Sequence, residues 1–185
     1  MSTITKALAH VVNDENLFVR NVAKVATDHF ESEFTIDGTH PYLYENAAIA
    51  NHVSGTTFLD TSRQLLKAIS HLFYAVPLAN RFVIRAANLD FTRWAKIGVP
   101  IQASVQLVPS EKTMSGQTVL SFTGSVTWHQ DGWQIGVLSG KFMTLPAAIE
   151  DQLMQPQYRQ VSRIRDALPV AEPATRAPLA CAETV

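Results

Sequence analysis

The chain has 185 residues, of which 46% are apolar and 17% are charged. This length and apolar fraction are typical of one folded domain and exclude disorder along the whole chain. The 15 Lys and Arg residues nearly balance the 16 Asp and Glu residues, so the net charge is −1. Such a balance gives no basic surface for nucleic acid or an anionic membrane, and neither partner is expected. The single cysteine, Cys181, excludes a disulfide framework and a zinc site built from cysteines.

The first residues are not typical of a signal peptide, because His10 and then Asn13-Asp14-Glu15 interrupt their apolar stretch. The sequence contains no run of about 18 apolar residues, so no transmembrane helix is expected. We therefore expect a cytoplasmic protein.

Two runs in the first part of the chain predict a β-hairpin. The run Leu17–Val25 is rich in β-branched residues. The run 30–36 alternates Phe30, Ser32, Phe34 and Ile36 with Glu31, Glu33 and Thr35. Thr27-Asp28-His29 can form the turn between them. Asp37-Gly38 ends the second strand, and residues 42–51 are expected to form a loop or a short helix.

The strongest helix signal follows Ser54-Gly55-Thr56, where Ser54 or Thr56 can cap the first turn. The pair Val76-Pro77 ends this helix by Tyr74 or Ala75, because a residue before proline avoids the helical region. The helix is therefore about 18 residues long, or about 27 Å. Its apolar face consists of Phe58, Leu59, Leu65, Leu66, Ile69, Leu72 and Phe73.

The rest of the folded part is predicted to form antiparallel strands. Runs at 80–86, 88–91, 101–107, 120–128 and 133–145 alternate in the manner of strands with one buried and one wetter face. The run 88–91 can extend the run 80–86 past a bend. Gln130-Asp131-Gly132 is a strong hairpin turn. Residues 147–167 are a candidate helix interrupted by Pro156. From Pro169 the chain is rich in Pro and Ala, so we expect a domain at 1–168 and a disordered tail at 169–185.

A hairpin, one long helix and then about four long strands indicate an α+β fold with the helix on one face of the sheet. The hotdog fold, a single antiparallel sheet wrapped round a long central helix, has this order of elements.

The predicted helix carries a polar stripe. Asp60, Gln64, Lys67 and His71 fall near one line, and Arg63 lies beside the first two. On a surface helix this would be an ordinary solvated face. On a wrapped central helix it would face a seam or a ligand, and Asp60 would then be a candidate general base.

Two resemblances begin at these residues. Gly55, Asp60 and Gln64 have the spacing of the helix start in hotdog dehydratases that act on carrier-protein thioesters. The longer stretch from Asp60 through Arg63-Gln64, His71, Tyr74 and Val76-Pro77-Leu78 to Phe82 resembles the A-factor biosynthesis hotdog family, the γ-butyrolactone synthases of antibiotic-producing bacteria. His40-Pro41 is similar to the family's upstream loop, and the likeness spans about residues 17–100.

The family resemblance implies an acyl-thioester enzyme that transfers a β-ketoacyl group to a small hydroxylated acceptor such as dihydroxyacetone phosphate. The implied catalytic residues are Asp60, Arg63, Gln64 and His40, with Arg63 able to hold a phosphate. Backbone N–H groups at Gly55 and Thr56 would polarise the thioester carbonyl, and His71 and Tyr74 would line the substrate site. The substrate would arrive on the phosphopantetheine of a carrier protein or of CoA, with no other cofactor and no metal. A single repeat would form a homodimer, since hotdog sites lie between two repeats.

The sequence departs from the family pattern in three ways. The family acid is usually Glu and here is Asp60, two repeats per chain are usual and here there is one, and Asn46 stands where the dehydratases have a histidine. Thioester hydrolysis or dehydration on the same substrates, and non-catalytic acyl binding, therefore remain alternatives to transfer.

Overall fold

The computed structural model describes residues 1–38, 52–114, 117–146 and 149. Three predictions fall outside these residues: the loop or short helix at 42–51, nearly all of the candidate helix at 147–167, and the tail from Pro169. The predicted boundary after residue 168 therefore stays a prediction. None of the described helices combines the length and the apolar character needed to cross a bilayer.

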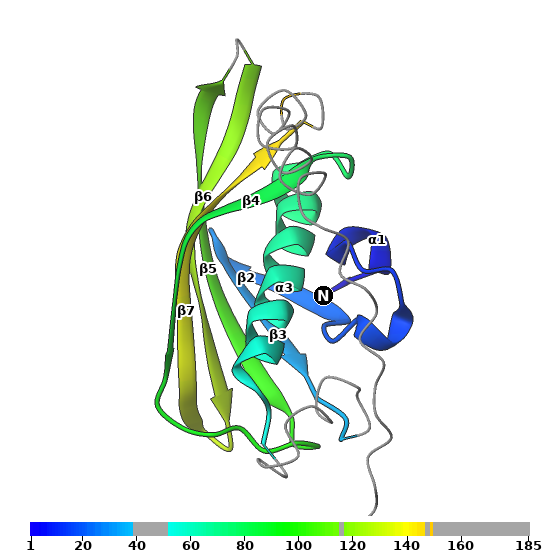
Figure 1. The fold of residues 1–185 in the computed structure, drawn as a ribbon, viewed down its shortest axis with the longest axis vertical. Coiled ribbons are helices and arrows are strands. Elements are labelled where there is room, and N and C mark those ends of the chain that lie inside the picture. The colour runs from blue at the N-terminus through cyan, green and yellow to red at the C-terminus, as the bar shows by residue number, and fades with distance from the viewer. Residues whose placement is uncertain (39–51, 115–116, 147–148, 150–185) are drawn as a thin grey trace, which may run out of the picture. The chain divides into compact units, whose positions relative to one another are not determined.

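Seven strands form one sheet in the order β1-β2-β3-β5-β6-β7-β4, and each neighbouring pair is antiparallel. The long strands β5, β6 and β7 are joined as a meander, while β4 crosses over to the free side of β7 (Figure 1). Antiparallel order was predicted from the alternation of the sequence and is confirmed. The strands are β1 (Ser2–Thr3), β2 (Asn21–Ala26), β3 (His29–Phe34), β4 (Arg81–Phe91), β5 (Ile101–Met114), β6 (Gln117–Gln130) and β7 (Trp133–Leu145).

The long helix α3 (Gly55–Tyr74) lies along the face of the curved sheet, and the short helix α1 (Lys6–Ala9) lies beside α3 on the side away from β7 (Figure 1). Ser54 caps α3, since its hydroxyl accepts a hydrogen bond from the Thr57 N–H at 3.3 Å. The helix ends where Ala75 takes a left-handed conformation with φ of 54°. Both predicted ends of the helix are confirmed.

The core forms between α3 and the sheet. Phe58, Leu65 and Ile69 are buried because their spacing places them on the helix face that meets the sheet. The Phe58 ring packs on the fully buried Trp128 of β6 with 4.9 Å between ring centroids. Leu59, predicted on the apolar face, is exposed instead, because it lies beside a groove described below.

The structure corrects two local predictions. The first strand begins at Asn21 rather than Leu17, because residues 17–19 are buried away from the ladder, and Phe18 N–H donates to a side chain of α3. Strand β5 continues from Leu107 to Met114, since β6 pairs with it along that whole length. The predicted extension of the run 80–86 into 88–91 is confirmed, since β4 is one strand with a register shift after Ile84. The predicted turn at Gln130-Asp131-Gly132 is confirmed by positive φ angles at Asp131 and Gly132.

Candidate functional site

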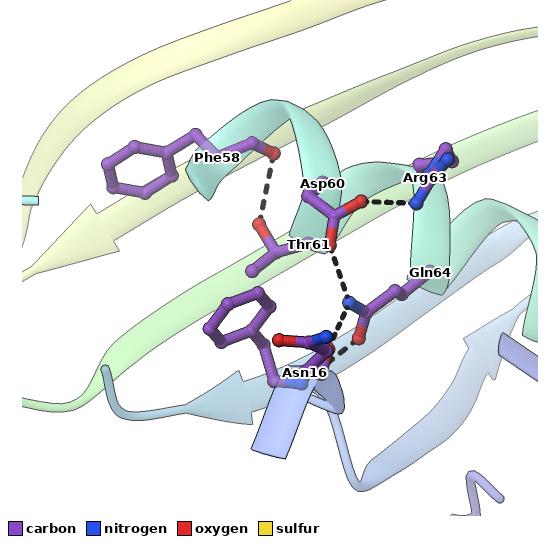
Figure 2. A network of polar contacts seen from close by, with 7 residues as sticks. Asn16, Phe58, Asp60, Thr61, Arg63 and Gln64 are labelled. Atoms are coloured by element: carbon purple, nitrogen blue, oxygen red, sulfur yellow. Dashed lines mark hydrogen bonds and ion pairs between the residues drawn. The ribbon is translucent and has the colours of Figure 1, made fainter. Parts of the chain in front are cut away.

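A polar network holds the Asp60 carboxylate in one orientation. Arg63 Nη2 lies 2.6 Å from Asp60 Oδ1, and the Gln64 amide N–H donates to Asp60 Oδ2 at 2.9 Å (Figure 2). Both carboxylate oxygens therefore have N–H donors. The Asp60 side chain is 20% exposed and that of Arg63 is 49% exposed, so the pair lies at the edge of the packed core. The two oxygens keep further lone pairs with which a substrate hydroxyl or a water could interact.

Gln64 joins this network to the N-terminal segment. Its side chain is fully buried, and its carbonyl oxygen accepts from the Phe18 N–H at 3.0 Å. Its amide N–H group also donates to the backbone oxygen of Asn16 at 2.7 Å. Both the oxygen and the nitrogen of this buried amide therefore have hydrogen-bond partners within the protein. Gln64 therefore positions Asp60 and anchors residues 16–18 at the same time.

The start of α3 opens onto a pocket. Within the described part of the chain, the backbone N–H groups of Gly55 and Thr56 have no acceptor, which is the ordinary state of the first helical turn. The pocket has a volume of about 560 Å³ with its solvent-open mouth. The helix dipole favours a negative charge here, as a thioester oxyanion would supply. It is lined by Val53, Gly55, Phe58, Phe91, Thr92, Arg93, Trp94 and Ala95.

A second, almost wholly apolar groove runs between α3 and the strands β4, β6 and β7. Leu59, Arg63 and Leu66 form its helix side, and the space amounts to about 440 Å³ with its open mouth. Gly124 and Gly140 face each other across β6 and β7 in its wall. A Cβ at Gly140 would clash with the backbone oxygen of Ala86, so the close approach of β4 requires glycine there. Arg63 thus reaches both the groove and the Asp60 carboxylate.

The other predicted site residues lie elsewhere. His71 and Tyr74 follow Asp60 on α3 by about three and four turns. The Tyr74 hydroxyl lies 2.6 Å from both Asp28 Oδ1 and the Leu107 oxygen, and burial, followed by the hydrogen bond to Asp28, raises the pKa of Tyr74. These contacts join α3 to the sheet. His40 lies outside the described residues.

Comparison with protein families gives a match over residues 1–146 to the family described as the A-factor biosynthesis hotdog domain. The chain belongs to this family. The predicted hotdog fold is confirmed: a seven-stranded antiparallel sheet curves round α3.

Solved structures support the same fold for this A-factor hotdog domain. One is the dehydratase heterocomplex ApeI:P from Xenorhabdus doucetiae, at 12% identity and a TM-score of 0.58, over 83% of this chain and 98% of that chain. Another is a hot-dog-like protein from Thermanaerovibrio acidaminovorans, at 14% identity and a TM-score of 0.51, over 80% and 98% of the two chains. A comparison with curated protein sequences gave no match. The family and the fold together support an association with acyl thioesters, without assigning a reaction.

Sequence reasoning missed one contact of the A-factor hotdog domain. His10 lies at the end of α1 with its Nε2 2.9 Å from Nε2 of His71. His71 Nδ1 lies 2.7 Å from the backbone oxygen of Val76, which can only accept. A neutral His71 therefore accepts at Nε2, and His10 donates. The signal at α1 was Thr5, whose hydroxyl caps the helix, but nothing in the spacing indicated a partner 61 residues away.

This partly buried pair predicts a loss of stability in acid. Burial, and then the charge of Lys67, lowers the pKa of His10 from 6.5 to about 4. As pH falls from 6.5 towards 4, the unfolded chain binds a proton at His10 while the folded chain does not. The free energy of unfolding, measured by urea denaturation, should therefore fall through this range and level off below it.

The matched variant is His10→Gln, which keeps an N–H donor for His71 and removes the titration. Its unfolding free energy should depend less on pH than that of the wild type over the same range. His129→Gln, a histidine of β6 outside this pair, should keep the wild-type dependence. An unchanged pH dependence in His10→Gln would contradict this role.

Proposed function

We propose that this A-factor hotdog protein is a cytoplasmic acyltransferase that moves a β-ketoacyl group from a carrier protein or CoA to a small hydroxylated acceptor. The observation that carries the proposal is the Asp60 carboxylate, fixed by Arg63 and Gln64 on the central helix beside an apolar groove. Family membership supports the substrate class. No metal is required by this chemistry, and the phosphopantetheine arm travels with the substrate.

The reaction uses residues of α3 in three roles. Asp60 accepts the proton of the acceptor hydroxyl while its oxygen attacks the thioester carbonyl carbon. The first-turn N–H groups at Gly55 and Thr56 stabilise the negative charge that develops on the carbonyl oxygen. The C–S bond then breaks, the ester forms, and the proton held by Asp60 goes to the leaving thiolate. Arg63 and Gln64 keep the carboxylate oriented throughout.

The apolar groove beside Arg63 is suited to the acyl chain. Its walls come mainly from hydrocarbon side chains and glycine backbone, with Arg63, Ser125 and Lys141 also in the lining. A saturated chain would lose contact with water there. The acyl head would then lie near the only charged side chain that reaches the groove from α3, that of Arg63.

The test is product analysis by mass spectrometry. The protein is incubated with a panel of β-ketoacyl thioesters on carrier protein and on CoA, with and without dihydroxyacetone phosphate. The proposal expects a new acyl ester that requires both the thioester and the acceptor. Free acid without acceptor would instead assign hydrolysis, and an enoyl product from a hydroxyacyl thioester would assign dehydration. Acyl binding without any product would assign a non-catalytic acyl-binding protein.

A second candidate function, dehydration or hydrolysis, is favoured by one observation. The solved structure with the TM-score of 0.58 is a dehydratase complex, and this chain keeps the acid and glutamine at the dehydratase spacing. Dehydration would need a further acid–base group besides Asp60, for which His40 is the predicted residue. Water in place of the acceptor hydroxyl would give hydrolysis at the same carboxylate.

We expect the protein to be a homodimer joined through β4. This strand pairs with β7 on one side and forms an edge of the sheet on the other. Ile84 on this strand is 55% exposed and Phe91 is 42% exposed, which makes an apolar edge that a second sheet can cover. Light scattering at micromolar concentration should give twice the chain mass of 20.4 kDa.

A charged side chain on the exposed edge of β4 should prevent a second sheet from pairing with it. Ile84→Glu should shift the protein towards monomer, while Thr123→Glu, an exposed position on β6 in the sheet interior, should leave the dimer intact. A stable wild-type monomer would contradict the dimer.

A further inference from the structure

In the part of the chain that the structure describes, the Lys67 ammonium group has no carboxylate partner. It lies on α3 one turn after Arg63, is half-buried, and has its Nζ 5.7 Å from the centre of the Phe82 ring. Among the described residues no carboxylate comes within ion-pair distance of it. The nearest acidic group on the helix is Asp60, whose two oxygens already receive donors from Arg63 and Gln64.

The surroundings of Lys67 are positively charged. Burial, followed by the guanidinium group of Arg63, lowers the pKa of Lys67 from 10.5 to about 8. The Asp60 carboxylate opposes this shift, and Arg81 adds to it. Arg63 lies on α3 and Arg81 begins β4, so positive charge approaches Lys67 from two elements.

His10 also lies beside the Phe82 ring. It comes from α1, a third element, and its ring contacts the Phe82 ring edge-on at 5.4 Å, as His71 does. Burial, then Lys67, His71, Arg81 and Arg63 in that order, all lower its pKa. No acidic residue contributes to this shift. Two imidazole rings and one ammonium group thus lie around Phe82.

We propose that Lys67, with His10 beside it, binds the oxyanion of a small molecule, a phosphate or a carboxylate group. An anion would supply the negative charge that the half-buried ammonium lacks, and charge-assisted hydrogen bonds to Lys are among the stronger polar contacts in proteins. A divalent metal on the two imidazoles is the competing possibility. The ammonium and guanidinium groups around them oppose a cation and favour an anion.

This site does not depend on the thioester reaction. Arg63, which could have held a phosphate by the sequence alone, is committed to Asp60, while Lys67 is not. Binding can therefore be measured in the full-length protein without any turnover assay.

The test is NMR titration of the Lys67 side chain and the His10 ring with sodium phosphate, sodium acetate and, at equal ionic strength, sodium chloride. Phosphate should raise the pKa of Lys67 from about 8 towards its ordinary value of 10.5 and should also raise that of His10. Both shifts should saturate. A response to phosphate alone assigns a phosphate group, and a response to phosphate and acetate assigns either oxyanion. No saturable response, or an equal response to chloride, overturns the proposal.

Three variants separate binding from folding. Lys67→Met should weaken phosphate binding about tenfold or more, and Lys67→Arg should keep it within about threefold, because the positive charge remains. Lys24→Met is the matched control: Lys24 also lies over a phenylalanine ring, at 6.0 Å from Phe30, but it is exposed on β2. Its phosphate affinity should equal that of the wild type. Wild-type affinity in Lys67→Met overturns the proposal. Should that variant fail to fold, the wild-type titration still decides.

Discussion

Replacing Asp60 with Asn should lower the turnover of an acyl thioester at least about 100-fold. The amide has the shape of the carboxylate but cannot accept a proton from the acceptor hydroxyl at neutral pH, and it ends the ion pair with Arg63. The measurement is kcat for the wild type and the variant with the thioester and acceptor that give product. Thermal unfolding and light scattering would show that fold and assembly persist.

Two further variants test whether the loss of turnover is specific to the Asp60 carboxylate. Asp131→Asn changes the same side chain at an exposed hairpin turn with φ of 53°, which Asn adopts readily, and should leave turnover unchanged. Asp60→Glu introduces the acid that the family usually carries and should keep more activity than Asp60→Asn. Unchanged turnover in Asp60→Asn would remove Asp60 from the mechanism, although the fold assignment would stand.

Replacing Gln64 with Leu should lower the free energy of unfolding by about 2–4 kcal/mol. Leucine has a similar volume, but it leaves the Phe18 N–H and the Asn16 carbonyl without their partner beside a buried position. Urea denaturation measures the change. The loss should also free residues 16–18 from α3, which hydrogen exchange at the Phe18 amide would report as faster exchange.

The control is Gln106→Leu, an exposed glutamine on β5. Its unfolding free energy should stay within about 0.5 kcal/mol of the wild type. If Gln64→Leu changed stability no more than this control, the amide would not anchor the N-terminal segment. Turnover in Gln64→Leu should fall as well, because Asp60 would lose one of its two orienting donors.

Features that depend on neighbours in sequence were predicted correctly. Ser54 caps α3, and the residue before Val76-Pro77 ends it, because both effects act within one helical turn. Asp131-Gly132 forms the hairpin turn because its positive φ angles suit these residue types. The contact between Asp60 and Gln64 follows from their i, i+4 spacing on a helix.

Contacts between distant segments were decided by the tertiary structure. Gln64 meets Phe18 across 46 residues, and His10 meets His71 across 61, because α1 and the following segment pack on the helix face away from the sheet. No periodicity in a short window carries that information, since a polar stripe looks the same whether water or a chain segment covers it. The sequence by itself determined the helix, the turns, the antiparallel sheet and the Asp60–Gln64 pair. Only the tertiary packing decided that the polar groups of Gln64 and Tyr74 form hydrogen bonds within the fold. It also decided that Lys67 has no counter-charge among the described residues.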